Sequence, residues 1–294
     1  MMTLRKSTHA WTHAALTGAL LLPGAVLANE THVYGIAQFG SAASGLCEAD
    51  SHSVHTKSAA EFADYFHSLR SAGLWSDVRV LNNTSARTNL WKDAALVPAA
   101  QAEDTLANAG VDDADVLFIH THGGHNKAHN RSWLVMGSNV NGCNAITDLH
   151  MNLGNGKLNI AVVKACQSGD FEVWRAGGYD ALAQGNGGFT VWNAFHGDSS
   201  CGNFVKRYVR HYVRNSKSTG VGENWIDQFY DRDLGKDNDD CPVSIVYGET
   251  KARRVRMFET GGWRDRQGTG SKSRSTFFGV AECDPSNGMK LPTQ

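Results

Sequence analysis

Two polar clusters follow apolar runs of the sequence, and their residue types could do chemistry. The run Asp115–Ile119 opens into His120–His125, which reads His-Thr-His-Gly-Gly-His, and the run Leu158–Val163 opens into Lys164–Asp170, which reads Lys-Ala-Cys-Gln-Ser-Gly-Asp. In open parallel sheets, working groups lie on loops at the carboxyl ends of strands. If the two runs are neighbouring parallel strands, the two clusters lie side by side.

A thiol and an imidazole facing each other across one cleft are what nucleophilic thiol catalysis requires. The pKa of a cysteine, near ~8.5, is easily lowered, so Cys166 could serve as nucleophile at neutral pH. Gly123 follows His122, and glycine lets the backbone approach a carbonyl oxygen closely. A helix expected after Gly169 would offer amino-terminal N–H groups to a thiolate or an oxyanion.

These residues resemble the caspase-like (clan CD) cysteine peptidases, and legumain and the gingipains more than caspases. The run from Ala165 to Gly169 is similar to the Ala-Cys-Glu-Ser-Gly run of legumain, and His122 precedes Cys166 by 44 residues, where those families have some forty. The resemblance implies His122 as catalytic histidine, Cys166 as nucleophile, the N–H groups of Gly123 and Cys166 as oxyanion donors, and a protein or peptide substrate. It also implies a three-layer α/β fold whose mostly parallel central sheet has helices on both faces. Caspases have Gln and Gly where this chain has Lys164 and Ser168.

Other interpretations compete with the peptidase. A single cysteine after a strand is more often a buried apolar side chain or a disulfide partner. The histidine spacing also resembles the ligand cluster of metallo-β-lactamase-like enzymes, which suggests a metal-dependent hydrolase, although Gly124 stands where a carboxylate ligand should be. Its ligands would be His120, His122, His125 and His196. A catalytically inactive caspase-like binding domain is a further alternative, because a fold can be retained after the catalytic activity has been lost.

The sequence evidence on substrate preference and metal binding consists of a few charged residues. Asp198 lies on the loop where the resemblance places a specificity pocket and would favour a basic residue before the cut, whereas Lys164 would argue the opposite. No cofactor is expected apart from a candidate structural calcium ion, because an acidic stretch clusters oxygen ligands. The residues of that stretch are Asp231, Asp233, Asp237 and Asp239.

The elements that must position these side chains alternate along the chain. Short apolar runs alternate with helical patterns, which is typical of βαβ units and a mostly parallel sheet. The predicted strands are Val33–Phe39, Asp77–Leu81, Asp115–Ile119, Leu158–Val163 and Gly188–Phe195, and the predicted helices are Ser58–Gly73, Pro98–Ala109 and Asn203–Asn215. Residues 29–294 are expected to form one caspase-like α/β domain, with a less regular C-terminal part over 216–294.

Residues 1–28 are typical of an export signal, with basic Arg5 and Lys6, an apolar stretch and small residues before Asn29. We therefore expect an exported protein, periplasmic or extracellular, without a membrane span. All six cysteines lie after residue 28, and six allow 15 disulfide pairings that the sequence cannot separate. If one is a catalytic thiol, a second must stay unpaired.

Composition limits the function classes. The chain is 41% apolar and 19% charged, which fits a globular protein. Without Arg5 and Lys6, 26 basic residues face 29 acidic ones, a net charge of −3. A chain so close to neutral is a poor candidate for non-specific nucleic-acid binding, which depends on an excess of Lys and Arg.

Overall fold

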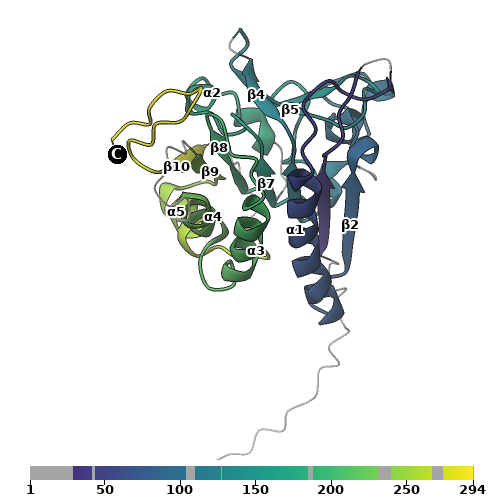
Figure 1. The fold of residues 1–294 in the computed structure, drawn as a ribbon. Coiled ribbons are helices and arrows are strands. Elements are labelled where there is room, and N and C mark those ends of the chain that lie inside the picture. The colour runs from purple at the N-terminus through teal and green to yellow at the C-terminus, as the bar shows by residue number, and fades with distance from the viewer. Residues whose placement is uncertain are drawn as a thin grey trace, which may run out of the picture.

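A seven-stranded, mostly parallel sheet forms the centre of the molecule (Figure 1). The computed structural model describes residues 29–41, 44–103, 110–126, 128–184, 188–230, 240–266 and 274–293. The strands are β1 (Glu30–Gly35), β2 (Asp77–Asn82), β3 (Val116–His120), β7 (Ile160–Lys164), β8 (Val191–His196), β9 (Cys241–Tyr247) and β10 (Ser275–Gly279). Their order is β10-β9-β8-β7-β3-β1-β2, and only the β8–β9 and β9–β10 pairs are antiparallel. The prediction that the five apolar runs form one mostly parallel sheet is confirmed.

The central strands are apolar because both of their faces are covered. Every residue of β3 and β7 is buried. Along β3 the side chains alternate between two hydrophobic cores, Phe118 with the helical layer and Ile119 with the opposite layer. A strand buried on both faces has no solvent-facing side that would carry polar residues, which explains the continuous apolar runs in the sequence.

The four longest helices cover one face of the sheet. They are α1 (Val54–Ser71), α3 (Val205–Asn215), α4 (Val221–Tyr230) and α5 (Lys251–Thr260). In Figure 1, α1, α3 and α4 stand side by side against the strands. The Phe62 ring of α1 stacks on Phe118 of β3 with 4.5 Å between centroids, which fixes the helix on the sheet. No helix in the described part of the chain has both the length and the apolar character of a membrane span.

The opposite face is covered mainly by short elements. They are the small antiparallel sheet of β4 (Gly123–Asn126), β5 (Arg131–Val135) and β6 (Asn144–Ile146), the five-residue helix α2 (Phe171–Arg175), and 3₁₀ turns at Asn83–Ser85, Thr88–Trp91, Ala99–Gln101, Val111–Asp113 and Asp180–Ala183. The helix predicted over Pro98–Ala109 is a 3₁₀ turn at its start, and residues 104–109 lie outside the described residues. Helices on both faces were predicted, but on this face only α2 is an α-helix among the described residues.

The chain after Ser216 is more regular than its sequence predicts. It contributes α4, α5 and two strands, and β9 is buried along its whole length. Two of these elements gave a weak signal because β9 begins Cys-Pro and α5 is rich in arginine. Packing against β8 and the helical layer stabilises them.

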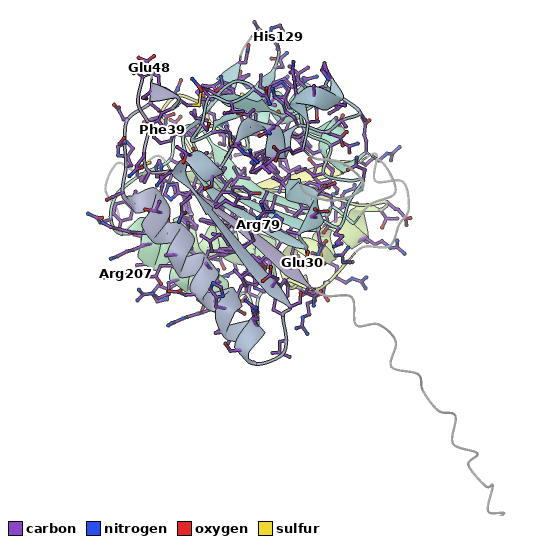
Figure 2. The ribbon with its side chains drawn as sticks, turned by 90° about the vertical axis from the view of Figure 1, so that its right-hand side faces the viewer. Glu30, Phe39, Glu48, Arg79, His129 and Arg207 are labelled. Atoms are coloured by element: carbon purple, nitrogen blue, oxygen red, sulfur yellow. A yellow bond between two sulfur atoms is a disulfide. The ribbon has the colours of Figure 1, made fainter. Side chains whose placement is uncertain are left out.

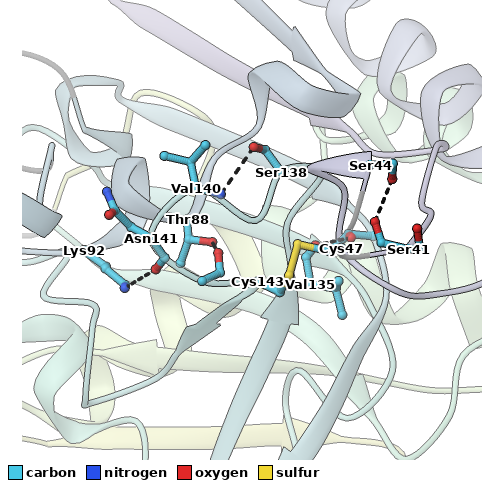
Figure 3. The surroundings of a disulfide bond; sticks show 12 residues. Ser41, Ser44, Cys47, Thr88, Lys92, Val135, Ser138, Val140, Asn141 and Cys143 are labelled. Atoms are coloured by element: carbon cyan, nitrogen blue, oxygen red, sulfur yellow. Dashed lines mark hydrogen bonds between the residues drawn. A yellow bond between two sulfur atoms is a disulfide. The ribbon is translucent and has the colours of Figure 1, made fainter.

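Two disulfides fasten segments above the carboxyl ends of the strands. Cys47, on the loop between β1 and α1, pairs with Cys143, just before β6 (Figure 3). Cys241, at the start of β9, pairs with Cys283 in the C-terminal segment. Phe39, Glu48 and His129, labelled in Figure 2, lie at this upper end, opposite Glu30 at the beginning of β1. Cys166 and Cys201 are free thiols.

Candidate active site

The two polar clusters meet at the carboxyl edge of the sheet. His120 and Lys164 are register partners at the ends of β3 and β7. One residue further, the Thr121 N–H donates to the Lys164 carbonyl oxygen at 3.2 Å. His122 lies two residues after the end of β3, and Cys166 lies two residues after the end of β7, its neighbour in the sheet. The predicted adjacency of the two loops is present in the structure.

Gly123 is the point of closest approach between the two loops. A Cβ at this position would lie 2.5 Å from the Cys166 carbonyl oxygen and 3.0 Å from the Ala165 Cβ. No side chain fits at these separations, so glycine is required for the loops to lie against each other. The Val135 N–H donates to the His122 carbonyl at 2.9 Å, which makes His122 and Val135 the hydrogen-bonded pair. In an antiparallel ladder the next N–H, that of Gly123, points away from the partner strand.

The His122 ring is half-buried and has one nitrogen fixed. Its Nε2 lies 2.7 Å from the Asp50 carbonyl oxygen, on the loop between β1 and α1. Because a carbonyl oxygen can only accept, Nε2 carries the hydrogen and Nδ1 keeps the lone pair of the neutral ring. The ring also packs on Phe39 at 5.0 Å and on His52 and His55 at 5.2 Å between centroids.

Cys166 is a half-buried free thiol. The Ser199 N–H donates to its Sγ at 3.4 Å, and the Ser199 carbonyl oxygen lies 3.7 Å from the same sulfur. Ser199 belongs to the loop after β8, the next strand in the sheet.

Gln167 is held in a strained conformation next to the thiol. Its φ is 52°, in the left-handed region that non-glycine residues rarely adopt. Its Oε1 accepts from the His125 N–H at 2.7 Å and its Nε2 donates to the Asn287 carbonyl at 2.6 Å. The side chain thus joins the histidine loop to the C-terminal segment. Strain of this kind persists only where the surroundings enforce it, and it gathers at functional sites.

The helix expected after Gly169 does not serve the thiol as predicted. It is the short α2, and the Asp170 side chain caps it by accepting from the Glu172 N–H at 3.1 Å. Asp170 is 1% exposed and lies between two imidazoles, with His125 Nδ1 at 2.9 Å and His196 Nδ1 at 3.1 Å. Burial raises the pKa of Asp170, but the contacts with His196, the Glu172 N–H and His125 together outweigh it and leave that pKa below its usual value.

The four histidines of the predicted metal hydrolase fall into two groups. His125 and His196 flank Asp170, whereas His120 and His122 both contact His55. Among the described residues, no group of ligand atoms close enough to share one ion contains all four histidines. That ligand set is therefore not assembled.

The two candidate specificity residues differ in accessibility. Lys164 is 0% exposed; its Nζ donates to the Ser200 carbonyl at 2.8 Å and lies 4.2 Å from the centre of the Phe195 ring. It points into the interior, which argues against a role in binding substrate. Asp198 is half-buried at the rim, where its Oδ1 accepts from the Asn287 Nδ2 at 3.4 Å.

A polar pocket of about 370 Å³ opens beside the thiol loop. Its lining residues are His125, Gln167, Asp170, Glu172, Asn287, Gly288 and Met289. Asp170 and Glu172 are its carboxylates, and none of its described lining residues is a lysine or arginine. The calcium candidates Asp231, Asp233, Asp237 and Asp239 lie outside the described residues.

Several residues of this region gave no recognisable signal in the sequence. Asp50, His52 and His55 come from far upstream, and Ser199 and Cys201 follow a strand whose end was predicted only as a loop. The spacing His52-Ser-Val-His55, where the histidines frame a helix start, is the one signal that could have been used. Comparison of the chain with models of known protein families, with curated proteins and with solved structures found no match.

Proposed function

We propose that this chain is a caspase-like cysteine-type hydrolase that cleaves peptide or amide bonds through Cys166 and His122. The observation that carries the proposal is the contact of the two loops at Gly123, which places a free thiol and a tautomer-fixed imidazole at the ends of adjacent strands. Four cysteines are paired while Cys166 stays reduced, as a nucleophile must.

The dyad divides the reaction into two steps. The Cys166 sulfur, its proton taken by His122 Nδ1, attacks the carbonyl carbon, and the carbon–sulfur bond forms as the carbonyl becomes an oxyanion. His122 then gives the proton to the leaving amine, the carbon–nitrogen bond breaks, and an acyl thioester remains. His122 next removes a proton from water, which attacks the thioester and releases the acid and the thiol.

Backbone N–H groups would stabilise the oxyanion. The Gly123 N–H points away from β5, and its residue lies against the Cys166 backbone. Together with the Cys166 N–H it forms the donor pair that the resemblance implies. Removing one donor of such a pair costs about 10²- to 10³-fold in rate.

The charges around the pocket favour a basic side chain next to the cleaved bond. Asp170 and Glu172 line the pocket, and Asp198 reaches its rim through Asn287. Lys164, the one opposing charge among the candidates, is buried elsewhere. The substrate we propose is therefore a protein or peptide with Lys or Arg at this position.

The proposed location is outside the cytoplasm, periplasmic or extracellular. Two disulfides fit an oxidising compartment, where such bonds form and persist. Residues 1–28, which carry the export pattern, lie outside the described residues. The two observations support the same proposal independently.

A peptide library with a mass-spectrometric readout tests the proposal. Cys166→Ser and His122→Ala should each reduce turnover by at least about 10³-fold, because each removes one half of a unit that acts together. His67→Ala and His129→Ala, at exposed positions, are matched controls and should retain activity. Iodoacetamide should label Cys166 faster than Cys201, because burial raises the pKa of the Cys201 thiol.

Two results would overturn the proposal. One is a folded wild-type protein that is inert towards the whole library. The other is turnover that survives Cys166→Ser while circular dichroism shows an unchanged fold, since the thioester cannot form without the sulfur.

A further inference from the structure

A second cluster of donor atoms lies behind His122, on the side of the loop between β1 and α1. His55 comes from the first turn of α1, His120 ends β3, and Cys201 follows β8. One ligand atom from each of these three residues lies within 4.8 Å of the other two. The His55 and His120 rings are 4.1 Å apart between centroids. The fold thus gathers two imidazoles and a thiol from three distant parts of the sequence.

Hydrogen bonds fix both imidazoles with Nε2 free. His55 Nδ1 lies 2.6 Å from the Ile36 carbonyl oxygen, so it carries the ring hydrogen. His120 Nδ1 contacts the Ser58 hydroxyl, whose oxygen also lies 2.8 Å from the Val54 carbonyl oxygen and 3.1 Å from the His55 carbonyl oxygen. With its single hydrogen on one of these two carbonyls, the hydroxyl accepts from the ring and leaves the lone pair on Nε2. Bonds of this kind from the outer nitrogen are what orient metal-ligating histidines.

His120 Nε2 is a buried lone pair without a partner. The residue is 1% exposed, and among the described residues no hydrogen-bond partner is found for this atom. A buried polar atom of this kind needs an explanation, because nearly all such atoms are satisfied. A Cys201 S–H bond to His55 Nε2 would explain the His55–Cys201 contact, but it would leave His120 Nε2 unsatisfied.

The spacing fits a tetrahedral metal ion. With Zn–N near 2.05 Å and Zn–S near 2.3 Å, a nitrogen and a sulfur bound to one ion lie ~3.6 Å apart. His55 Nε2 and Cys201 Sγ are 3.7 Å apart before any ion is added.

We propose that His55 Nε2, His120 Nε2 and Cys201 Sγ bind a divalent zinc-type cation, with the fourth position left for water or an incoming group. Two imidazoles and one thiolate are borderline-to-soft ligands, which select Zn²⁺ over Ca²⁺ or Mg²⁺. Binding replaces the Cys201 S–H bond with a sulfur–metal bond and releases the proton to solvent.

One carboxylate near the cluster bears on this site. The Asp240 carboxylate accepts from the Ser200 N–H at 2.6 Å and offsets part of the added positive charge. Neither Cys166 nor His122 is a ligand, so the site stands independently of the proposed hydrolase.

Cobalt titration of the full-length, disulfide-intact protein tests the site. Co²⁺ bound to a thiolate gives a near-ultraviolet charge-transfer band, and calorimetry measures Zn²⁺ affinity. The wild type should bind one equivalent and show the band. Cys201→Ser should lose the band and weaken Zn²⁺ binding by at least ~100-fold, whereas Cys166→Ser should retain both.

A second variant keeps the test decisive if Cys201→Ser fails to fold. Ser58→Ala leaves all three ligands in place and removes the group that orients His120, so it should weaken Zn²⁺ binding by ~10- to 100-fold and keep the band. The site is refuted if the wild type gives no band, or if the band survives Cys201→Ser and disappears in Cys166→Ser, which would place the ion on the other thiol.

Discussion

At the scale of single residues, backbone carbonyls decide which nitrogen of each histidine is reactive. Asp50 holds Nε2 of His122 and thereby leaves Nδ1 free, whereas Ile36 holds Nδ1 of His55 and leaves Nε2 free. The rings are 5.2 Å apart, yet they present opposite nitrogens. One imidazole is therefore suited to proton transfer and its neighbour to coordination.

Charge at the pocket should set substrate preference. Asp198→Asn and Glu172→Gln are each expected to lower kcat/KM for peptides with Arg at the cleaved bond by roughly fivefold. The physical reason is that a partly exposed charge pair contributes ~1 kcal/mol, which corresponds to this fold-change. Peptides with a neutral side chain there should be unaffected. The comparison of the two peptide series on each variant checks this, and Glu249→Gln, on a distant exposed turn, is the control. Equal losses for both series would contradict an electrostatic role.

Asp148 should make stability fall with rising pH. Burial raises its pKa from 3.8 to about 6, and its side chain accepts from the Ala181 N–H at 2.8 Å. Between about pH 4 and pH 6 the folded state keeps a proton that the unfolded state has lost, so stability decreases as the pH rises through this window. Asp148→Asn should remove that part of the pH dependence in chemical denaturation curves.

The substitution suits the position. The φ of Asp148 is 57°, a region that asparagine tolerates, and the amide oxygen can still accept from Ala181. Asp64→Asn, at an exposed position on α1, should leave the slope between pH 4 and pH 6 unchanged. A slope that persists in Asp148→Asn would assign the effect to another group.

At the scale of elements, the start of β4 and the thiol loop act as one unit because Gly123 lets them touch. Gly123→Ala should displace His122 relative to Cys166 and lower kcat/KM by on the order of 100-fold, since small misplacements of reacting groups are costly. Gly262→Ala is the matched control, because a Cβ there meets only the Asp265 carboxylate at 3.6 Å. Thermal unfolding of both variants separates displacement from loss of fold, and an active Gly123→Ala enzyme would refute the coupling.

The elements that could be predicted are those whose sequence repeats a simple period. The buried strands β3 and β7 and the amphipathic helix α3 are such cases. The sheet of β4, β5 and β6 was missed because Gly123–Asn126 contains no apolar residue and pairs mainly through its backbone. A helix was expected after Gly169, and α2 begins there with Asp170 as its cap but is only five residues long.

Only the part of the candidate site that lies at the ends of the central strands could be predicted from the sequence. The strand ends predicted that the loops carrying His122 and Cys166 lie side by side, because parallel neighbours share an edge. Lys164 looked equally available, yet the alternation along β7 directs its side chain into the interior. Asp50, His55 and Cys201 belong to the region through packing between distant segments, and a single sequence carries no local pattern for such contacts.

At the scale of the whole molecule, the two disulfides fasten the walls of the candidate site. Cys47–Cys143 ties down the loop that carries Asp50 and Phe39, both of which contact His122. Cys241–Cys283 anchors the segment whose Asn287 carbonyl binds Gln167 and whose Met289 carbonyl accepts from His196. Cys47, Cys241 and Cys283 also belong to the hydrophobic core on the side of the short elements, whereas the core under the helices contains none of the four paired cysteines among the described residues.

Reduction should therefore cost activity before it costs the fold. With increasing dithiothreitol, turnover should first rise as oxidised Cys166 is restored and then fall as the disulfides open, while far-ultraviolet circular dichroism stays nearly constant. A double Cys47→Ala and Cys143→Ala variant should show the low activity without reductant, and parallel loss of both signals in the wild type would contradict this order.

For the proposed exported hydrolase, the same arrangement would make activity depend on the redox state of the compartment. A nascent chain in a reducing cytosol would hold Cys166 as a thiol but lack the two disulfides that fix its surroundings, so it would gain full activity only after the proposed export. Oxidation of four cysteines would then complete the proposed catalyst in the compartment to which it is exported.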